Sequence, residues 1–220
     1  FIRLKLLKMN SALYQYINYI KSDFKKINKS RKAKLFELSS YLIHKNKTRG
    51  QANLTFICTH NSRRSHLAQI WAATSASYYG LNNIFTYSGG TMVTRFNDRV
   101  IKTLKKNGFV INNPDGHNPH YLVSFSDRNR PLECFSKKYD SPFNPKKNFA
   151  AIMTCSNADS TCPYIPESEE RILIPYDDPK VYDGTKSEEK FYQKSCKKIA
   201  TEMLFCMKIV DEKKMCKNLN

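Results

Sequence analysis

A cysteine, an arginine and a serine stand at a spacing that suits the binding of a tetrahedral anion. Residues 53–65 read Asn-Leu-Thr-Phe-Ile-Cys-Thr-His-Asn-Ser-Arg-Arg-Ser, so Cys58 is followed by Arg64 and Ser65 in a Cys-x5-Arg-Ser pattern. Five intervening residues let the chain curl around an oxyanion, with backbone N–H groups pointing inward and a helix starting at the rim. Cys58 would then lie at the bottom of the loop, where the helix N-terminus and the Arg64 charge favour the nucleophilic thiolate.

The other residues of this loop have supporting roles in the predicted site. The Arg64 guanidinium can hold two anion oxygens, and the Ser65 hydroxyl can donate to the Cys58 sulfur. Asn61 is a residue type that tolerates the left-handed turn such a loop requires. The predicted oxyanion-binding set is the run Thr59, His60, Asn61, Ser62, Arg63 and Arg64.

The segments around the loop predict a strand before it and a helix after it. Leu-Thr-Phe-Ile before Cys58 is apolar and β-prone, and residues 65–79 read as a helix. This setting favours an anion site over the alternative of a structural cysteine at a strand end. Further strands are predicted at 84–90, 149–154 and 171–174, and further helices at 96–107 and 186–210. We therefore predict an α/β fold with a small parallel four-stranded sheet flanked by helices, with ligands at the carboxyl ends of the strands.

Two regions fall outside this alternation of strands and helices. Apolar residues recur at helical spacing over 11–28, and Ser30 can cap a second helix that ends before Gly50. We predict an N-terminal helical hairpin, which either covers a core face or mediates dimerisation, the first being favoured. After a brief strand at 109–111, five prolines interrupt residues 113–148 and indicate an inserted hairpin or flap. The predicted organisation is a helical extension at 1–50, a catalytic domain at 51–212 and a tail at 213–220.

Composition limits the class of protein and of partner. The 220 residues include 37 Lys plus Arg and 19 Asp plus Glu, a formal charge of +18, which suits an anionic substrate. The lysines are scattered along the whole chain, which favours a solvated surface over a nucleic-acid face. Seven cysteines without a regular framework favour a reducing cytoplasm. The sequence contains no apolar run of 18 residues, so we predict no membrane span. Residues 1–8 read as an upstream extension without a targeting role, with Met9 as a candidate start.

A second pair of cysteines follows the strand predicted at 149–154. Cys155 and Cys162 are seven residues apart, and Cys155 stands at a strand end on the same sheet edge as Cys58. Structural zinc sites favour two to four residues between paired ligands, so we predict neither a metal nor a cofactor. Two alternatives remain, namely two unrelated buried cysteines or a relay of thiols beside Cys58. A third candidate is Asp178 in Tyr-Asp-Asp-Pro, a carboxylic acid that could protonate the oxygen that leaves the anion.

Together these residues resemble the low-molecular-weight protein tyrosine phosphatase superfamily, and within it the thioredoxin-coupled arsenate reductases. The resemblance covers residues 53–112 and 149–210. It implies that Cys58 is the nucleophile, that the loop with Arg64 and Ser65 holds the oxyanion, and that Asp178 is the general acid.

The resemblance also separates the two kinds of enzyme in this superfamily. Cys155 and Cys162, followed by Pro163, match a Cys-x6-Cys pair that the reductases carry and the phosphatases usually lack. The chain departs from both patterns at two positions. His60 stands where a small residue is expected, and Arg63 stands where many relatives have a second cysteine.

The predicted function is arsenate reduction. Cys58 attacks arsenate, Asp178 protonates the departing oxygen, and the disulfide moves from Cys58–Cys155 to Cys155–Cys162, where a thioredoxin-like reductant resolves it. The alternative is a low-molecular-weight phosphatase, in which water resolves a cysteinyl-phosphate formed from phosphotyrosine or a small aryl phosphate. A third hypothesis is a basic regulatory module whose loop senses phosphate without turnover, and the presence of Asp178 weighs against it.

Overall fold

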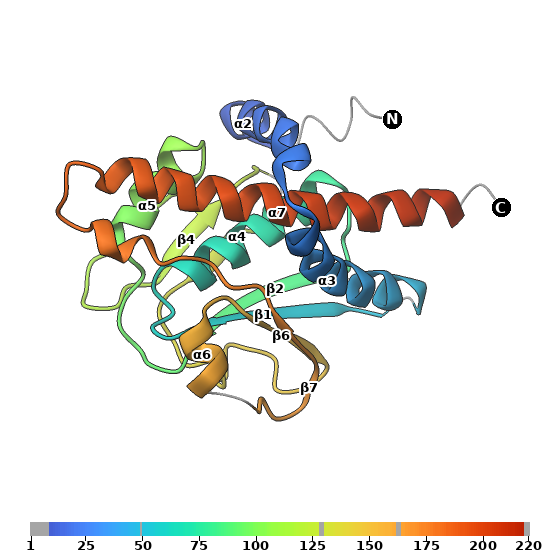
Figure 1. Ribbon diagram of the computed structural model, residues 1–220. Helices are drawn as coiled ribbons and strands as arrows, with labels where there is room; N and C mark the ends of the chain where they lie inside the picture. The colour runs from blue at the N-terminus through green and yellow to red at the C-terminus, as the bar shows by residue number, and fades with distance from the viewer. Residues whose placement is uncertain (1–8, 49, 128–129, 162–163, 218–220) are drawn as a thin grey trace.

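A parallel four-stranded sheet lies at the centre of the fold in the computed structural model (Figure 1). The structure describes residues 9–48, 50–127, 130–161 and 164–217, so the predicted extension at 1–8, Cys162 and Pro163 lie outside the described residues. The strand order is β2-β1-β6-β7. The strands are β1 Ala52–Cys58, β2 Ile84–Gly90, β6 Phe149–Met153 and β7 Ser168–Leu173. The predicted α/β class with a parallel four-stranded sheet is confirmed.

The strand order places the nucleophile between two neighbouring strand ends. β1 is buried at all but one position and β6 at every position, as expected for apolar central strands of a parallel sheet. Cys58 is paired with Gly90 of β2, and Ile57 with Met153 of β6. The chain that leaves β6 therefore passes beside Cys58 and carries Cys155 to the same edge of the sheet.

Helices cover one face of this sheet and enclose the main core. α4 (Arg64–Tyr78) contacts β1, β2 and α7, and α7 (Glu188–Lys217) crosses the molecule beside α5 (Asp98–Lys106) (Figure 1). α7 continues beyond residue 210, where the predicted helix ended. At the centre Trp71 is fully buried, and its Nε1 donates to the Cys196 sulfur at 3.1 Å.

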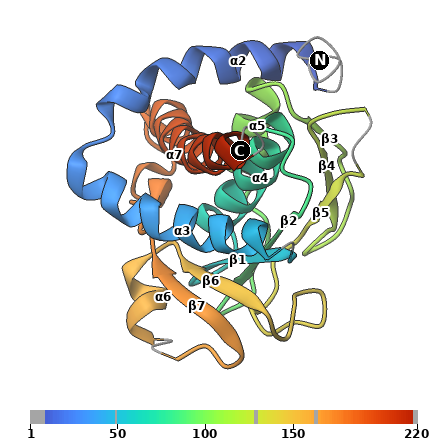
Figure 2. The same ribbon diagram turned by 90° about the vertical axis from the view of Figure 1, so that its right-hand side faces the viewer.

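The N-terminal segment forms α2 (Ser11–Lys21), the 3₁₀ helix η1 (Ser22–Lys26) and α3 (Lys29–Lys47). Viewed along α7, α2 and α3 lie on different sides of that helix, and both contact it (Figure 2). Their buried apolar residues belong to the same core as α4 and α7. Asn28 caps α3 instead of Ser30, because its extended backbone lets the Asn28 side chain accept from the Arg31 N–H at 2.8 Å.

The inserted region forms a second, antiparallel sheet of order β3-β4-β5, made of β3 Val110–Ile111, β4 Tyr121–Ser124 and β5 Leu132–Cys134. The brief strand predicted at 109–111 therefore belongs to the insert and not to the main sheet, because it pairs with β4. After β5 the chain returns to the main sheet, where Lys138 bridges to Gly90. Two short helices remain, α6 (Ser156–Thr161) after β6 and the 3₁₀ helix η2 (Pro179–Tyr182) after β7.

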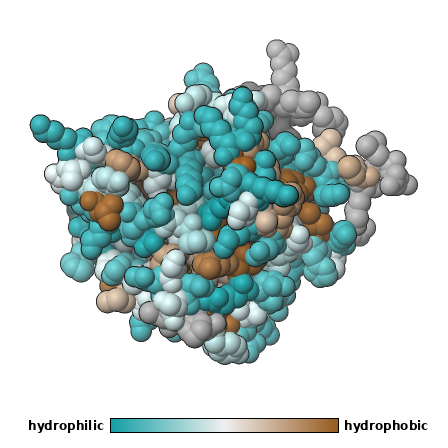
Figure 3. Space-filling view, in the orientation of Figure 1, coloured by the Kyte–Doolittle hydropathy of each residue, from teal (hydrophilic) through white to brown (hydrophobic). Residues whose placement is uncertain are grey.

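The face seen in Figure 3 is mainly hydrophilic, with separate apolar areas between the polar side chains. Within the described ranges, no helix combines the length and the apolar character that crossing a bilayer requires.

Candidate active site

The loop between β1 and α4 holds the Cys58 thiol at its base. Cys58 is 3% exposed, and its sulfur lies 3.1 Å from the Ser65 hydroxyl oxygen. Asn61 has a left-handed backbone with φ of 43°, and its Nδ2 donates to the Ser65 oxygen at 2.9 Å. Because that oxygen accepts from Asn61, the Ser65 proton is free to point at Cys58. The arrangement supplies a hydrogen-bond donor to a thiolate.

The backbone of the loop offers a set of donors to an anion. Among the described residues, the N–H groups of 59–63 donate to no other group of the protein. α4 begins at Arg64, so its N-terminal dipole adds positive potential at the same place. Unpaired N–H groups in front of a helix N-terminus are the arrangement that binds phosphate-like anions in other proteins.

Segments far away in the sequence fix the shape of this loop. The His60 carbonyl accepts from the Ser136 hydroxyl at 2.9 Å, and the Asn61 side-chain oxygen accepts from the Lys137 N–H at 3.0 Å. A Cβ on Gly90 would come within 2.7 Å of the Asn61 nitrogen, so only glycine allows β2 to end this close to the loop. The insert and β2 thus support the loop from outside.

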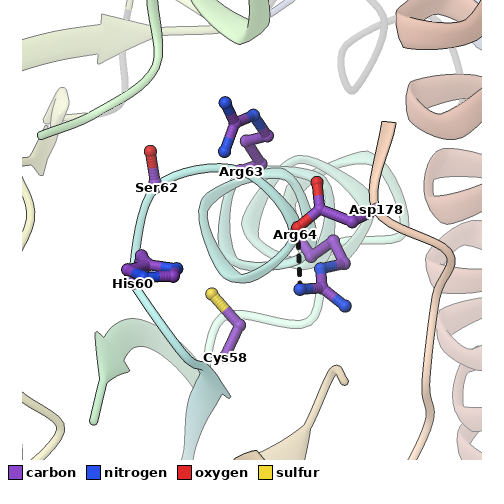
Figure 4. Close-up of a pocket in the computed structure, with 6 residues that line it drawn as sticks. All are labelled: Cys58, His60, Ser62, Arg63, Arg64 and Asp178. Carbon is purple, nitrogen blue, oxygen red and sulfur yellow. Dashed lines mark hydrogen bonds and ion pairs between the residues drawn. The ribbon is translucent and has the colours of Figure 1, made fainter. Parts of the chain in front are cut away.

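A small pocket opens above Cys58 (Figure 4). It is partly open to solvent and is lined by Cys58, His60, Ser62, Arg63, Arg64 and Asp178. The Arg64 Nη2 donates to Asp178 at 2.8 Å, and its Nη1 donates to the Tyr176 carbonyl at 3.2 Å. The Arg64 Nε is buried and has no hydrogen-bond partner among the described residues. An oxyanion in the pocket could accept from this donor, because guanidinium groups bind oxyanions through two N–H groups.

The side chain of Arg63 turns away from the Cys58 sulfur (Figure 4). Its Nε donates to the Tyr192 hydroxyl at 2.8 Å, and its Nη2 donates to Asp183 at 2.9 Å. Of the residues predicted to bind the oxyanion, Arg63 therefore has the charge of its side chain matched by Asp183. The side chains of Thr59 and Ser62 are also engaged, with Cys155 and with the Arg95 carbonyl respectively.

Cys155 lies next to the loop. It is 1% exposed, and its sulfur is 3.6 Å from the hydroxyl oxygen of Thr59. Thr59 directly follows Cys58 in the sequence. Cys58 and Cys155 belong to one buried apolar cluster with Ile57, Met153 and other residues. The structure thus brings Cys58, Arg64, Ser65, Asp178 and Cys155 to one edge of the sheet, while the predicted Cys162 falls outside the described residues.

His66, in the first turn of α4, links the loop to the insert. It is fully buried, its ring lies against Phe96 with centroids 4.2 Å apart, and its Nε2 is 3.2 Å from the Phe135 carbonyl oxygen. Burial, together with the nearby Lys137 charge, lowers the pKa of His66 to about 3. The ring is therefore neutral at neutral pH.

This depressed pKa predicts an acid sensitivity of the fold. The unfolded chain binds a proton at His66 below about pH 6.5, whereas the folded chain does not until about pH 3, so stability falls as the pH drops through this window. We expect His66→Gln to lose less unfolding free energy than the parent between about pH 7.5 and about pH 5, measured by urea denaturation. The exposed His117 gives the control His117→Gln, which should follow the parent. If the unfolding free energy depended on pH in the same way in all three proteins, the lowered pKa of His66 would be contradicted.

Sequence reasoning missed the residues that hold the loop and the Asp178 segment in place. Ser136, Lys137, Asp183 and Tyr192 make these contacts across 76 to 129 positions of sequence. The one local signal was the pair Gly89-Gly90 at the end of the strand predicted at 84–90, since glycine in a strand can mark a close approach of backbones.

Parts of the chain are similar to known proteins. Residues 53–122 match the family model described as low molecular weight phosphotyrosine protein phosphatase. An arsenate reductase of Halalkalibacterium halodurans is 27% identical over 134 residues, which cover 61% of this chain and 78% of the relative. Among solved structures, a low molecular weight phosphotyrosine phosphatase of Vibrio cholerae is 14% identical with a TM-score of 0.47, covering 71% of this chain and 94% of its own. An arsenate reductase of Archaeoglobus fulgidus is 15% identical with a TM-score of 0.45, covering 70% and 98%.

Proposed function

We propose that the chain, which is similar to low molecular weight phosphotyrosine phosphatases and to an arsenate reductase, is an enzyme that reduces arsenate. The observation that carries this proposal is the position of Cys155. A second thiol beside the oxyanion loop, in one cluster with Cys58, is what a reductase needs and a hydrolase does not.

In the first step the loop binds arsenate and Cys58 attacks it. The N–H groups of 59–63 and the Arg64 guanidinium hold the oxygens, and the Ser65 hydroxyl stabilises the thiolate until it attacks arsenic. The incoming oxyanion competes with Asp178 for the Arg64 donors. Its arrival frees the Asp178 carboxylate, which takes up a proton from solvent and then donates it to the departing hydroxyl group, so that this group leaves as water.

In the second step Cys155 attacks the Cys58 sulfur. The sulfur–arsenic bond breaks, its electron pair stays on arsenic, and arsenite leaves as a Cys58–Cys155 disulfide forms. Arsenic is thus reduced from the +5 to the +3 state while two thiols are oxidised to one disulfide. Cys162 then attacks Cys155, and a thioredoxin-like dithiol returns the enzyme to its starting state.

The second candidate function is hydrolysis of a phosphate monoester, which uses the same loop and the same acid. The family model that matches residues 53–122 is a phosphatase model, which favours this candidate. The pocket itself favours a small inorganic anion, because its lining residues are all polar apart from Cys58. Tyr182, the aromatic residue closest in sequence to Asp178 on its C-terminal side, stacks on Phe191 with centroids 3.4 Å apart.

The two candidates are separated by running two assays on one preparation. Arsenate-dependent oxidation of reduced thioredoxin is measured beside hydrolysis of an aryl phosphate, each as kcat/KM. We expect thioredoxin oxidation that depends on arsenate and stops when arsenate is omitted. Efficient aryl phosphate hydrolysis without thioredoxin oxidation would assign the chain to the phosphatases, and inactivity in both assays would leave the phosphate-sensing hypothesis.

The acid role of Asp178 predicts a dependence on the leaving group. Positioned proton transfer is typically worth about 10²–10⁴ in rate, so Asp178→Asn should lower kcat by about this factor for aryl phosphates with poor leaving groups. The loss should be small for phenols of low pKa, which leave without a proton. Equal losses across a series of substituted phenyl phosphates would show that Asp178 does not donate the proton.

A further inference from the structure

Arg63 takes part in a closed set of hydrogen bonds at the side of the loop. Its guanidinium donates to Tyr192 at 2.8 Å and to Asp183 at 2.9 Å, and the Tyr192 hydroxyl donates to the other oxygen of Asp183 at 2.7 Å. The Arg63 and Asp183 side chains are 13% and 23% exposed. Each of the three side chains therefore contacts the other two, and the hydrogen bonds between them are largely shielded from water.

Asp183 ends the short segment that carries Asp178. This segment leaves β7, passes Tyr176 and Asp178, and forms η2 before reaching Asp183. At its start the Tyr176 N–H donates to the Thr154 carbonyl at 3.0 Å, and the Tyr176 carbonyl accepts from Arg64. At its end Asp183 is bound by Arg63. Two consecutive arginines of the oxyanion loop thus hold the segment on both sides of Asp178.

The contact at Asp183 has additional support from α5. The Arg99 Nε lies 2.7 Å from Glu188 and 3.7 Å from Asp183. Tyr192 is 1% exposed on α7, so its hydroxyl is fixed by the core. Arg63 therefore joins the loop to an anchored carboxylate, and a displacement of that carboxylate would move the segment that bears Asp178.

We propose that Arg63 is a positioning residue that sets the location of Asp178 over the pocket, an inference that rests on the proposed role of Asp178 as general acid. Arg63 acts through Asp183, and it does not contact the substrate with its side chain. A planar guanidinium suits this role, because it donates from Nε and Nη2 in fixed directions to two acceptors at once. A cysteine at this position could not make both hydrogen bonds.

The proposal is tested by removing the guanidinium and following acid catalysis, anion binding and segment mobility separately. In Arg63→Met, kcat/KM should fall by about tenfold or more for aryl phosphates with poor leaving groups and by less than about threefold for good ones. Inhibition by inorganic phosphate should change by less than about twofold, since the loop donors remain. Tyr192→Phe, which removes one partner at nearly constant volume, should show a smaller loss of the same kind.

A double-mutant cycle distinguishes positioning from general damage. In the Asp178→Asn background, Arg63→Met should lower kcat/KM by less than about twofold, because no acid remains to be positioned. Arg95→Met is the matched control, since Arg95 is an exposed arginine near the loop that pairs with Asp98. It should keep the parent's leaving-group dependence. Equal losses for good and poor leaving groups, or an undiminished effect in the Asp178→Asn background, would overturn the proposal.

Hydrogen exchange gives a readout that does not depend on turnover. Amides of 177–183 should exchange faster in Arg63→Met than in the parent and in Arg95→Met, measured by mass spectrometry. Unchanged exchange in this segment would overturn the positioning role even if the parent turned over neither arsenate nor aryl phosphate. Inactivity of the parent with faster exchange in the variant would instead reject the proposed function while Arg63 still anchored the segment.

Discussion

Replacing Cys58 with serine is expected to abolish both arsenate turnover and aryl phosphate hydrolysis. A serine hydroxyl has no comparable anionic form near neutral pH, so the nucleophile is lost while the loop keeps its donors. We expect kcat to fall by more than about 10³-fold, a barrier increase of about 4 kcal/mol. The measurement is the rate of thioredoxin oxidation and of phenol release with the parent and the variant at equal concentration.

The exposed cysteine of α7 provides the control for this prediction. Cys216→Ser removes a thiol that lies at the surface and should leave both rates unchanged. Binding of inorganic phosphate to Cys58→Ser should persist, which shows that the loop is still formed. Appreciable turnover by Cys58→Ser would contradict both proposed reactions, because arsenate reduction and phosphate hydrolysis both begin with attack by Cys58.

Replacing Cys155 with serine is expected to stop arsenate turnover and to spare most aryl phosphate hydrolysis. Only the reductase requires a second thiol, whereas water resolves the cysteinyl-phosphate in the hydrolase. The disulfide needs the Cα atoms of Cys58 and Cys155 within about 7 Å, and the Cys155 thiol must leave its contacts with Thr59 and Ala158 to form it. A loss of more than about 10³-fold in thioredoxin oxidation is expected, since among the described residues no other thiol shares the cluster with Cys58.

Mass spectrometry after a single arsenate turnover identifies the disulfides directly. Cys155 should be joined to Cys162 in the parent, and Cys58 to Cys155 in Cys162→Ser. Cys206→Ser is the matched control, because Cys206 is also fully buried but lies on α7 against α3. If all three thiols stay free after arsenate treatment while aryl phosphate is hydrolysed efficiently, the reductase proposal is wrong and the phosphatase takes its place.

Local patterns were enough to predict the main sheet and the outline of the site. The apolar run before Cys58 predicts a buried strand because a central parallel strand has no solvent face. The Cys-x5-Arg-Ser spacing predicts the loop because its geometry is encoded within eight residues, and the structure gives Asn61 the left-handed backbone that this interpretation requires. Both features depend on neighbours in sequence.

Contacts between distant segments could not be predicted in this way. The pairing of β3 with β4 depends on how the insert folds back, and a two-residue strand has no periodicity that names its partner. The direction of the Arg63 side chain depends on Asp183 and Tyr192, more than a hundred positions away. A single sequence contains no signal for such a pairing, since one arginine in a loop looks the same whether it binds substrate or protein.

The position of α7 has a consequence for the order of events during synthesis. This helix contacts α2, α3, α4 and α5, and its Tyr192 holds Arg63 of the oxyanion loop. The ribosome makes the loop and its nucleophile early, but these helices have no common partner until residues beyond 188 have left the exit tunnel. Apolar faces of α2, α3 and α4 would remain exposed until α7 has been made, a period in which unfinished chains are prone to aggregate. The nascent protein is therefore expected to depend on chaperones that shield α2, α3 and α4 until α7 has been made.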